Sequence, residues 1–312
     1  MAAQRETEGS KANIVMWGAP TCGKTTFLAA LSIALGRQSE GWKVIGANDQ
    51  STRALVTLTT QLSDGVFPKA SGAVIEHYRW RLVGQELRRG GWKSLFRRSP
   101  VGVQFGLDLA DLGGEGYSPR RLTQKELIDD LVNSRGIVFL FDPVREFEKG
   151  DAFEYLFGVL SHLSQHFLEN PEFSSGLLPH HLAICITKFD ELRVLETAEK
   201  LGLTQPDEEE HFPRVDDGDD ARELFEKLCE VSASGYGGMI LNTLEQYFAP
   251  ERTRYFVTSA IGFHVDPRLG YDPDDHQNVM TDEKGFTRIR GTVRPVNVME
   301  PLLWLGRRLG KK

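Results

Sequence analysis

The sequence predicts an α/β fold in which a mostly parallel sheet is covered by helices on both faces. Short runs of β-branched and aromatic residues alternate along the chain with segments whose apolar residues recur at helical spacing. This alternation is typical of parallel strands joined by helices. The chain has 312 residues, of which 40% are hydrophobic and 26% charged, so it can bury a sizeable core. We therefore expect three layers, with the sheet between two layers of helices.

The individual elements follow from the same patterns. Strands are expected at residues 14–17, 73–82, 101–110, 137–141, 182–186 and 255–258. Helices are expected at residues 25–36 and 50–62, from Pro119 onward, and at residues 152–168, 221–231, 239–248 and 298–309. Gly36 is expected to end the first helix, because glycine readily takes the left-handed conformation that follows many helices.

The chain contains no internal repeat and no strong linker, so we expect one domain over residues 1–312. Three segments interrupt the alternation and are interpreted as insertions, at about residues 38–70, 195–250 and 262–294. The second of them includes an acidic, proline-broken stretch at residues 206–220.

Composition argues against several classes of protein. The formal net charge of −7 disfavours general nucleic-acid binding. The three cysteines lie far apart without a CxxC pair, which disfavours a zinc site or a disulfide framework and fits a reducing compartment. The N-terminal segment lacks the apolar core of a signal peptide, and no apolar run is long enough to span a membrane. A cytoplasmic location is therefore expected.

The motif GxxxxGK[ST] is present in full from Gly18 to Thr25, between an expected strand and an expected helix. This is the context of a phosphate-binding loop, the P-loop, whose glycines turn successive N–H groups toward an anion. Lys24 would reach the β- and γ-phosphates, and the Thr25 hydroxyl would hold Mg²⁺. The flanking elements argue against a chance match. The residues expected to contact nucleotide here are Gly18, Ala19, Pro20, Thr21, Cys22, Gly23, Lys24, Thr25 and Thr26.

A second phosphate-side motif follows the strand expected at residues 101–110. Asp111 ends this run and could hold the Mg²⁺ shell through water. Gly114, three residues later, could offer its N–H to a γ-phosphate, so the loop would respond to that phosphate. Glu115 follows it.

Two further motifs bear on the choice of base, which the P-loop alone leaves open between ATP and GTP. Thr187-Lys188-Phe189-Asp190 follows an apolar strand. The Asp190 carboxylate could accept N1–H and N2–H of guanine, a pair of donors that adenine lacks, while the Lys188 stem covers the base. Thr258-Ser259-Ala260 follows the last sheet strand, where a backbone N–H could meet the guanine O6.

In this order, GAPTCGKT, DLGG, TKFD and TSA resemble the motifs of the translation-factor-related (Ras-like) P-loop GTPases, over about residues 13–262. The resemblance implies a three-layer P-loop NTPase fold, GTP and GDP as ligands, and Mg²⁺ as cofactor. It also implies a first-switch ligand to Mg²⁺, for which Ser71 is the candidate. The ending PVNVMEPLLWL and the long first-switch region are similar to bacterial double-GTPase-type conflict-system proteins. By this resemblance the guanine-side residues are Thr187, Lys188, Asp190, Ser259 and Ala260.

The chain departs from that family's pattern at three positions. Thr187 replaces the usual asparagine, Pro20 replaces a common glycine, and Glu115 stands where many members have a water-orienting glutamine. The last two changes predict slow hydrolysis, with Glu115 and Lys24 as the candidate catalytic residues. The sequence singles out no internal arginine for the phosphates, and Arg79, Arg81 and Arg120 stay open. An arginine from outside would come from a partner or from a second copy in a homodimer.

We therefore expect a slow GTPase that acts as a conformational switch on an unidentified effector protein. One alternative is a P-loop ATPase whose TKFD match is accidental. The other is a nucleotide-bound scaffold that never turns over.

A basic loop at residues 86–100 joins two expected strands and interleaves aromatic residues with positive charge. Such a segment can bind an anionic membrane, a single-stranded nucleic acid or an acidic partner. A solvated hairpin tip is the plainer interpretation. The basic residues are Arg88, Arg89, Lys93, Arg97 and Arg98.

Overall fold

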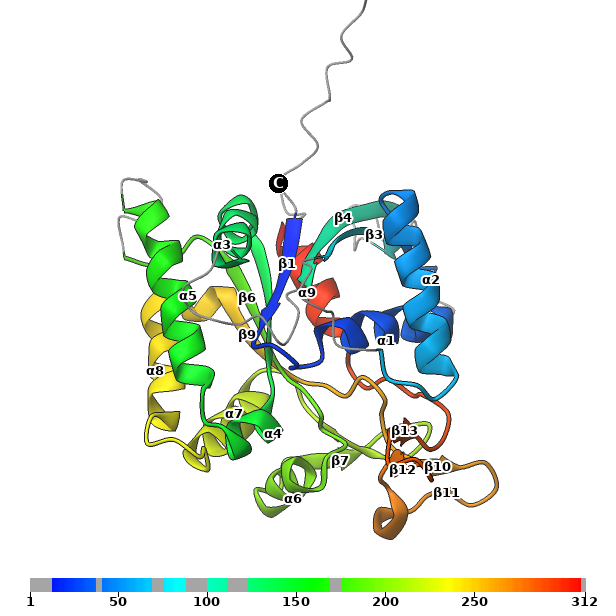
Figure 1. The fold of residues 1–312 in the computed structure, drawn as a ribbon. Helices are drawn as coiled ribbons and strands as arrows, with labels where there is room; N and C mark the ends of the chain where they lie inside the picture. The colour runs from blue at the N-terminus through cyan, green and yellow to red at the C-terminus, as the bar shows by residue number, and fades with distance from the viewer. Residues whose placement is uncertain are drawn as a thin grey trace, which may run out of the picture.

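A computed structural model describes residues 13–37, 41–68, 76–87, 100–111, 123–168 and 176–309. A seven-stranded sheet forms its centre, in the order β2-β3-β4-β1-β5-β6-β9 (Figure 1). Strands β4, β1, β5, β6 and β9 pair in parallel, whereas β3 is antiparallel to β4 and β2 is antiparallel to β3. The strands are β1 (Asn13–Gly18), β2 (Lys43–Gly46), β3 (Glu76–Leu87), β4 (Pro100–Asp111), β5 (Gly136–Phe141), β6 (His181–Ile186) and β9 (Thr253–Val257).

Helices cover both faces of this sheet (Figure 1). Side chains alternate along the central strands, so Ile14 and Met16 enter one core layer while Val15 and Trp17 enter the other. The first layer lies under α1 (Lys24–Arg37), α2 (Asp49–Ser63) and α9 (Glu300–Leu309). The second lies under α3 (Thr123–Asn133), α5 (Ala152–Phe167), α6 (Leu192–Lys200), α7 (Asp219–Glu230) and α8 (Gly237–Tyr247). The expected three-layer α/β arrangement is confirmed.

Most of the expected elements are present, and their ends differ by a few residues. The placement of Gly36 as a helix end is wrong, because α1 continues to Arg37 and Gly36 lies inside it without a left-handed φ. The apolar side chains of α1 pack on the sheet through its last turns, so packing outweighs the preference of one glycine. The expected helix start at Pro119 lies outside the described residues, and the described helix begins at Thr123.

The three expected insertions contain regular structure. Residues 38–70 supply β2 and α2, which extend the sheet and cover its edge. Residues 195–250 supply part of α6, then α7, α8 and a small hairpin of β7 (Thr204–Pro206) and β8 (Pro213–Val215). Residues 262–294 supply two more hairpins, β10 (Val265–Asp266) with β11 (Gly270–Tyr271) and β12 (Val279–Thr281) with β13 (Thr287–Ile289). Single-turn 3-10 helices lie at Pro250–Arg252 and Pro273–Asp275. That residues 1–312 form a single domain stays a prediction.

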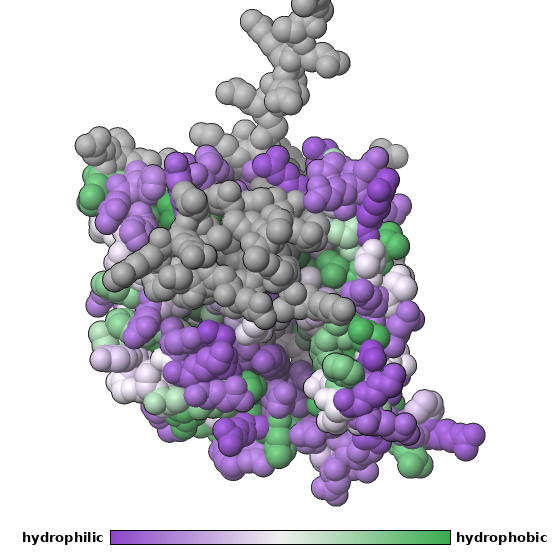
Figure 2. All heavy atoms as spheres, in the orientation of Figure 1, coloured by the Kyte–Doolittle hydropathy of each residue, from purple (hydrophilic) through white to green (hydrophobic). Residues whose placement is uncertain are grey.

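The parallel strands end along one edge of the sheet, which is where α/β proteins bind their ligands. Gly18, Phe141, Ile186 and Val257 are the last residues of β1, β5, β6 and β9. The described residues proposed for the site lie at the ends of β1, β4, β6 and β9 or directly after them. In the view of Figure 2, hydrophilic residues predominate on the described part of the surface, and apolar residues form small groups. None of the described helices has the length and apolarity needed to cross a bilayer.

Candidate nucleotide-binding site

The segment between β1 and α1 forms a tight loop around its own lysine. Lys24, the first residue of α1, is 5% exposed. Its Nζ donates to the carbonyl oxygens of Gly18 and Ala19, each at 3.1 Å. Thr21 and Gly23 have positive φ values of 64° and 93°, a conformation that turns backbone N–H groups to the inside of a loop. The loop therefore brings a cation and inward-facing donors together at the N-terminus of α1, an arrangement suited to binding an anion.

Gly18 is required by the closeness of its neighbours. A Cβ at this position would lie 2.6 Å from the Cys22 Sγ and 2.7 Å from the Leu140 carbonyl oxygen. The Cys22 thiol is buried under the loop, and burial raises its pKa. Thr25 and Thr26 follow in the first turn of α1, where the Phe27 N–H donates to the Gly23 carbonyl at 2.7 Å. Close packing at Gly18 and the positive φ of Gly23 thus favour glycine at these two positions.

The metal side of the site is described in part. Val15 of β1 pairs with Asp108 of β4, so Asp111 lies three residues further along, level with Gly18 at the same edge. A hydroxyl from Thr25 and a carboxylate from Asp111 are the hard oxygen ligands that Mg²⁺ prefers, and the residues present fit that ion. The side chain of Asp111 and all of Ser71, Gly114 and Glu115 lie outside the described part of the structure, as does Arg120.

The base side lies at the ends of β6 and β9. Asp190 is 7% exposed, and its carboxylate accepts a hydrogen bond from the Ser259 hydroxyl. The Ser259 Oγ accepts in turn from the Gly262 N–H at 2.8 Å. Burial raises the pKa of Asp190 to about 6, against the hydrogen bond from Ser259, which lowers it. The half-buried Ala260 follows Ser259, so the structure brings the residues expected at the base together.

Backbone contacts hold the two base-side segments in place. The Thr187 hydroxyl donates to the Phe141 carbonyl at 3.0 Å, and the Phe189 N–H donates to the Thr258 carbonyl at 3.1 Å. Lys188 takes a positive φ of 59°, and its Nζ lies 2.8 Å from an Asp142 carboxylate oxygen. Direct contacts therefore join the segments after β5, β6 and β9 into one unit.

A cleft of about 630 Å³ lies beside this unit and away from the phosphate loop. The end of α1, residues 207–210 and residues 294–300 line it. Val296, one of the lining residues, pairs with Ser259. The cleft thus adjoins the base side of the site through residues 294–300.

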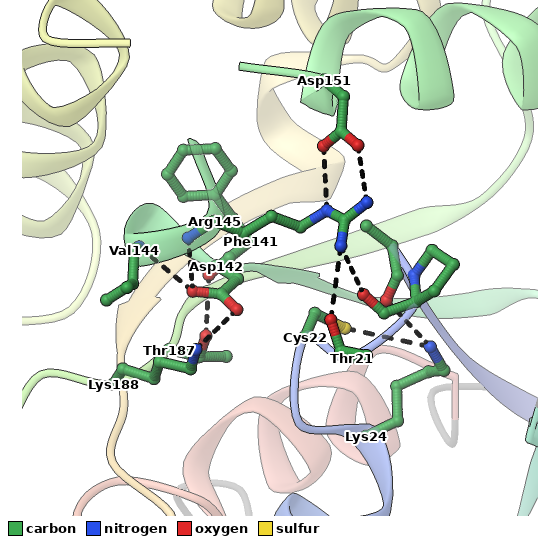
Figure 3. A network of polar contacts seen from close by, with 12 residues as sticks. Thr21, Cys22, Lys24, Phe141, Asp142, Val144, Arg145, Asp151, Thr187 and Lys188 are labelled. Carbon is green, nitrogen blue, oxygen red and sulfur yellow. Dashed lines mark hydrogen bonds and ion pairs between the residues drawn. The ribbon is translucent and has the colours of Figure 1, made fainter. Parts of the chain in front are cut away.

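Sequence reasoning missed three charged residues at the centre of the site, which lie on or near α4 (Pro143–Glu148). Asp142 caps this helix, with one carboxylate oxygen accepting from the Val144 and Arg145 N–H groups at 3.1 and 3.2 Å. Arg145 reaches the phosphate loop, and Asp151 pairs with Arg145 (Figure 3). The available signal was Asp142-Pro143 directly after an apolar strand, since an acidic cap followed by proline commonly begins a helix.

Two of the arginines that the sequence left open, Arg79 and Arg81, lie on β3, away from the ligand edge of the sheet. In the backbone register of β3 and β4, Arg79 lies opposite Asp108 and Arg81 lies opposite Gly106. Glu76 is the residue opposite Asp111. At about 3.3 Å per residue, the two arginines are roughly 10 and 17 Å from the ligand edge along the strand. Both are exposed.

Comparison with known proteins gives distant structural matches. No protein-family model matches the chain, and no curated protein sequence matches it. The chain is similar to the signal recognition particle receptor SRb in the SRb-GTP/SRX complex of Chaetomium thermophilum, with 13% identity and a TM-score of 0.40, over 80% of this chain and 91% of that one. It is similar to sup35 complexed with GDP, with 14% identity and a TM-score of 0.31, over 86% of this chain and 43% of that one.

A third similar structure is the S. cerevisiae Ski7 GTPase-like domain bound to GTP, with 14% identity and a TM-score of 0.42, over 96% of this chain and 50% of that one. The chain thus spans half or less of the length of the second and third of these proteins. Similarity at this level does not assign it to a family. Its own strand–loop–helix geometry and parallel sheet give it a P-loop NTPase fold.

Proposed function

We propose that this protein binds guanine nucleotides and hydrolyses GTP slowly to GDP and phosphate. The observation that carries the proposal is the buried Asp190 carboxyl, which lies on the same sheet edge as the phosphate loop. A carboxylate there can accept hydrogen bonds from both N1–H and N2–H of guanine. Adenine has no such pair of donors on that edge, so the site favours guanine.

The neighbouring residues complete the recognition of the base. Lys188 is tied to Asp142, so its apolar stem can lie over the base while its ammonium stays paired. Thr187 holds the strand end through the Phe141 carbonyl. The backbone N–H of Ala260 would donate to the guanine O6, and Ser259 would orient the Asp190 carboxylate through the hydrogen bond between them.

The loop between β1 and α1 would bind the phosphates. Lys24 would exchange its contacts with the Gly18 and Ala19 carbonyls for the β- and γ-phosphates, which are stronger acceptors. Thr25 and Asp111 would hold Mg²⁺, with Ser71 as the first-switch ligand and Gly114 as donor to the γ-phosphate. Bound Mg²⁺ would neutralise charge on the β- and γ-phosphate oxygens.

Turnover would depend on positioning and electrostatics without a covalent intermediate. In this proposal Glu115 contacts the attacking water, but its negative charge opposes the charge that develops on the γ-phosphate. Loss of the γ-phosphate contact at Gly114 would release the loop after β4, which gives a nucleotide-dependent switch acting on an effector protein in the cytoplasm. The proposal also includes a relationship to the double-GTPase-type conflict-system proteins, which the similarity of residues 295–305 suggests. It further includes assembly into a homodimer.

Titration with fluorescent GDP and ADP analogues, with and without Mg²⁺, tests the proposal. We expect GDP to bind at least about a hundredfold more tightly than ADP, since a site built around a paired acceptor leaves that acceptor unsatisfied with adenine. Preference for ADP would favour the P-loop ATPase instead. Tight GDP and GTP binding without phosphate release in single-turnover assays would favour the nucleotide-bound scaffold.

A further inference from the structure

The guanidinium of Arg145 lies on the phosphate loop (Figure 3). Its NH1 donates to the Pro20 carbonyl at 3.2 Å and contacts the Thr21 hydroxyl at 3.3 Å. Pro20 and Thr21 occupy the middle of the loop, between Gly18 and Gly23. A permanent positive charge is therefore placed directly beside the segment whose amides would contact the phosphates.

Asp151 fixes the orientation of this guanidinium. The Arg145 Nε lies 2.8 Å from one carboxylate oxygen of Asp151, and NH2 lies 2.5 Å from the other. Such a two-point pair holds the planar group in one orientation and leaves NH1 directed at the loop. Burial lowers the pKa of Arg145, but the hydrogen bond and ion pair with Asp151 outweigh burial and raise it. The arginine side chain is 15% exposed, so water screens its charge only in part.

Contacts that do not involve the Arg145 side chain also hold α4 in place. Asp142 caps the helix with its carboxylate and pairs with Lys188. The fully buried Glu146 accepts hydrogen bonds from the Ser232 hydroxyl and from the Ala152 N–H. Because these contacts anchor α4 already, holding the helix is not a sufficient reason for an arginine that spans from it to the phosphate loop.

We propose that Arg145 is an internal arginine that contacts the phosphates of bound GTP and stabilises the charge that develops there during hydrolysis. The inference rests on the proposed GTPase function and adds a residue to it. In the reaction, the water oxygen bonds to the γ-phosphorus, the bond from that phosphorus to the β–γ bridging oxygen breaks, and the proton of the water passes to the phosphate product. Arg145 forms no covalent bond, and Asp151 is its positioning residue.

An arginine in the same chain changes the expected dependence on concentration. A guanidinium supplied by a second copy would make the hydrolysis rate rise with protein concentration. Arg145 makes the single-turnover rate constant independent of concentration. Pro20, which would crowd an arginine arriving from outside, accepts a hydrogen bond from this internal one through its carbonyl.

The test is single-turnover GTP hydrolysis with protein in excess, combined with GDP and GTPγS affinities from the same preparations. We expect Arg145→Ala to lower the hydrolysis rate constant about tenfold to a hundredfold, while the GDP affinity changes less than about threefold. Guanidinium added to the buffer should restore part of the lost rate. Asp151→Asn should give a smaller loss of rate, because the arginine keeps its charge but loses its fixed orientation.

Two further variants complete the test, one as a matched control and one as a second replacement of Arg145. Arg222→Ala is the matched control, because Arg222 also pairs with a carboxylate, Glu245 at 2.7 Å, but lies on α7; its rate should equal that of wild type. Arg145→Gln keeps a hydrogen-bond donor and removes the charge, and it decides the question if Arg145→Ala does not fold. It should be as slow as Arg145→Ala.

The inference is overturned if an Arg145 variant that binds GDP normally hydrolyses GTP at the wild-type rate. It is also overturned if the variant loses GDP and GTPγS affinity while its rate constant at saturation is unchanged, because Arg145 would then only shape the loop. A wild-type protein that binds GTP without hydrolysing it overturns the inference but leaves guanine-nucleotide binding in place. A wild-type protein that binds no guanine nucleotide removes the proposed function and the inference together.

Discussion

The Lys188 ammonium lies 2.8 Å from the Asp142 carboxylate, and this ion pair joins the base side of the site to the phosphate side. Lys188 belongs to the segment after β6 that carries Asp190. Asp142 caps the N-terminus of α4, which carries Arg145 to the phosphate loop. The pair therefore links the two sides of the site through the ends of the adjacent strands β5 and β6.

Replacing Asp142 tests this connection. Asp142→Ala removes a helix cap and the partner of a half-exposed lysine, so the free energy of unfolding should fall by about 1–2 kcal/mol. GDP affinity should fall severalfold as Lys188 loses its position. Thermal melting without nucleotide and GDP titration measure the two effects. Glu196→Gln is the control, because its ion pair with Lys200 is exposed and should contribute almost nothing. A normal melting temperature for Asp142→Ala would show that the pair is incidental.

The phosphate loop gives the second prediction. Lys24→Ala removes the charge nearest to the loop carbonyls, and Thr25→Ala removes the hydroxyl proposed for Mg²⁺. Each should weaken GTP binding at least about tenfold, or about 1.4 kcal/mol. Only Thr25→Ala should also abolish the stimulation of binding by Mg²⁺. Lys43→Ala, at an exposed lysine of β2, serves as the control. Unchanged affinity in both loop variants would remove the site from this loop.

The pH dependence of guanine binding follows from the pKa of Asp190, which burial raises to about 6. Guanine requires the ionised carboxylate as acceptor, so GDP affinity should be constant well above pH 6. It should fall as pH decreases through 6, to about a tenth of its plateau at pH 5. Asp190→Asn is the control, because protonation of the nucleotide phosphates affects both proteins alike. Parallel pH profiles for the two proteins would mean that Asp190 does not contact the base.

The same carboxyl affects the stability of the nucleotide-free protein with a definite sign. Its pKa is higher in the folded state than its ordinary value of 3.8, so the folded state binds the proton more tightly. The contribution of Asp190 to stability is therefore fully present below about pH 4 and is lost as pH rises through 6. In Asp190→Asn, the part of the decrease in stability with rising pH that Asp190 causes should be absent. Urea unfolding of both proteins at pH 5 and pH 7.5 measures the free energies of unfolding that show this.

The basic loop at residues 86–100 gives a prediction that is independent of nucleotide. Its strands are present, because β3 and β4 pair as far as Leu87 and Pro100, but residues 88–99 lie outside the described part of the structure. If the loop contacts an anionic membrane or partner, neutralising Arg88, Arg89, Arg97 and Arg98 should leave GDP binding intact. Retention on anionic liposomes should fall, and the wild-type retention should weaken with salt. Equal retention of the two proteins at low salt would indicate a solvated hairpin.

The sequence predicted the fold and the site best where a short contiguous motif imposes its own geometry. Gly18 to Thr25 is such a case, since a Cβ on Gly18 would collide with Cys22 and Leu140. Asp190 is another, because its position after an apolar strand places it at the ligand edge of the sheet. Both inferences needed only the local sequence and the alternation of strands and helices.

Features that depend on tertiary contacts were missed. The helix α4 has six residues, too few to produce an apolar period, so nothing in the pattern indicated that Arg145 would face the phosphate loop. Its contacts span 125 positions to Pro20. The strand β2 has only four residues, and it is stabilised by pairing with β3, which lies beyond α2 in the chain. Packing against the sheet likewise carried α1 past Gly36.

The central claim is that Asp190 selects guanine, and the ratio of GDP to XDP affinity in wild type and Asp190→Asn tests it most directly. Xanthine presents a carbonyl acceptor where guanine has its amino group, so the asparagine amide can donate to it whereas the carboxylate is repelled. We predict that wild type prefers GDP, and that Asp190→Asn loses GDP affinity at least about tenfold and gains XDP affinity, reversing the preference. Ser259→Ala, which loosens the carboxylate without replacing it, should weaken GDP binding without reversing the preference. An Asp190→Asn variant that keeps the wild-type preference for GDP, or a wild-type protein that prefers ADP, would contradict the account.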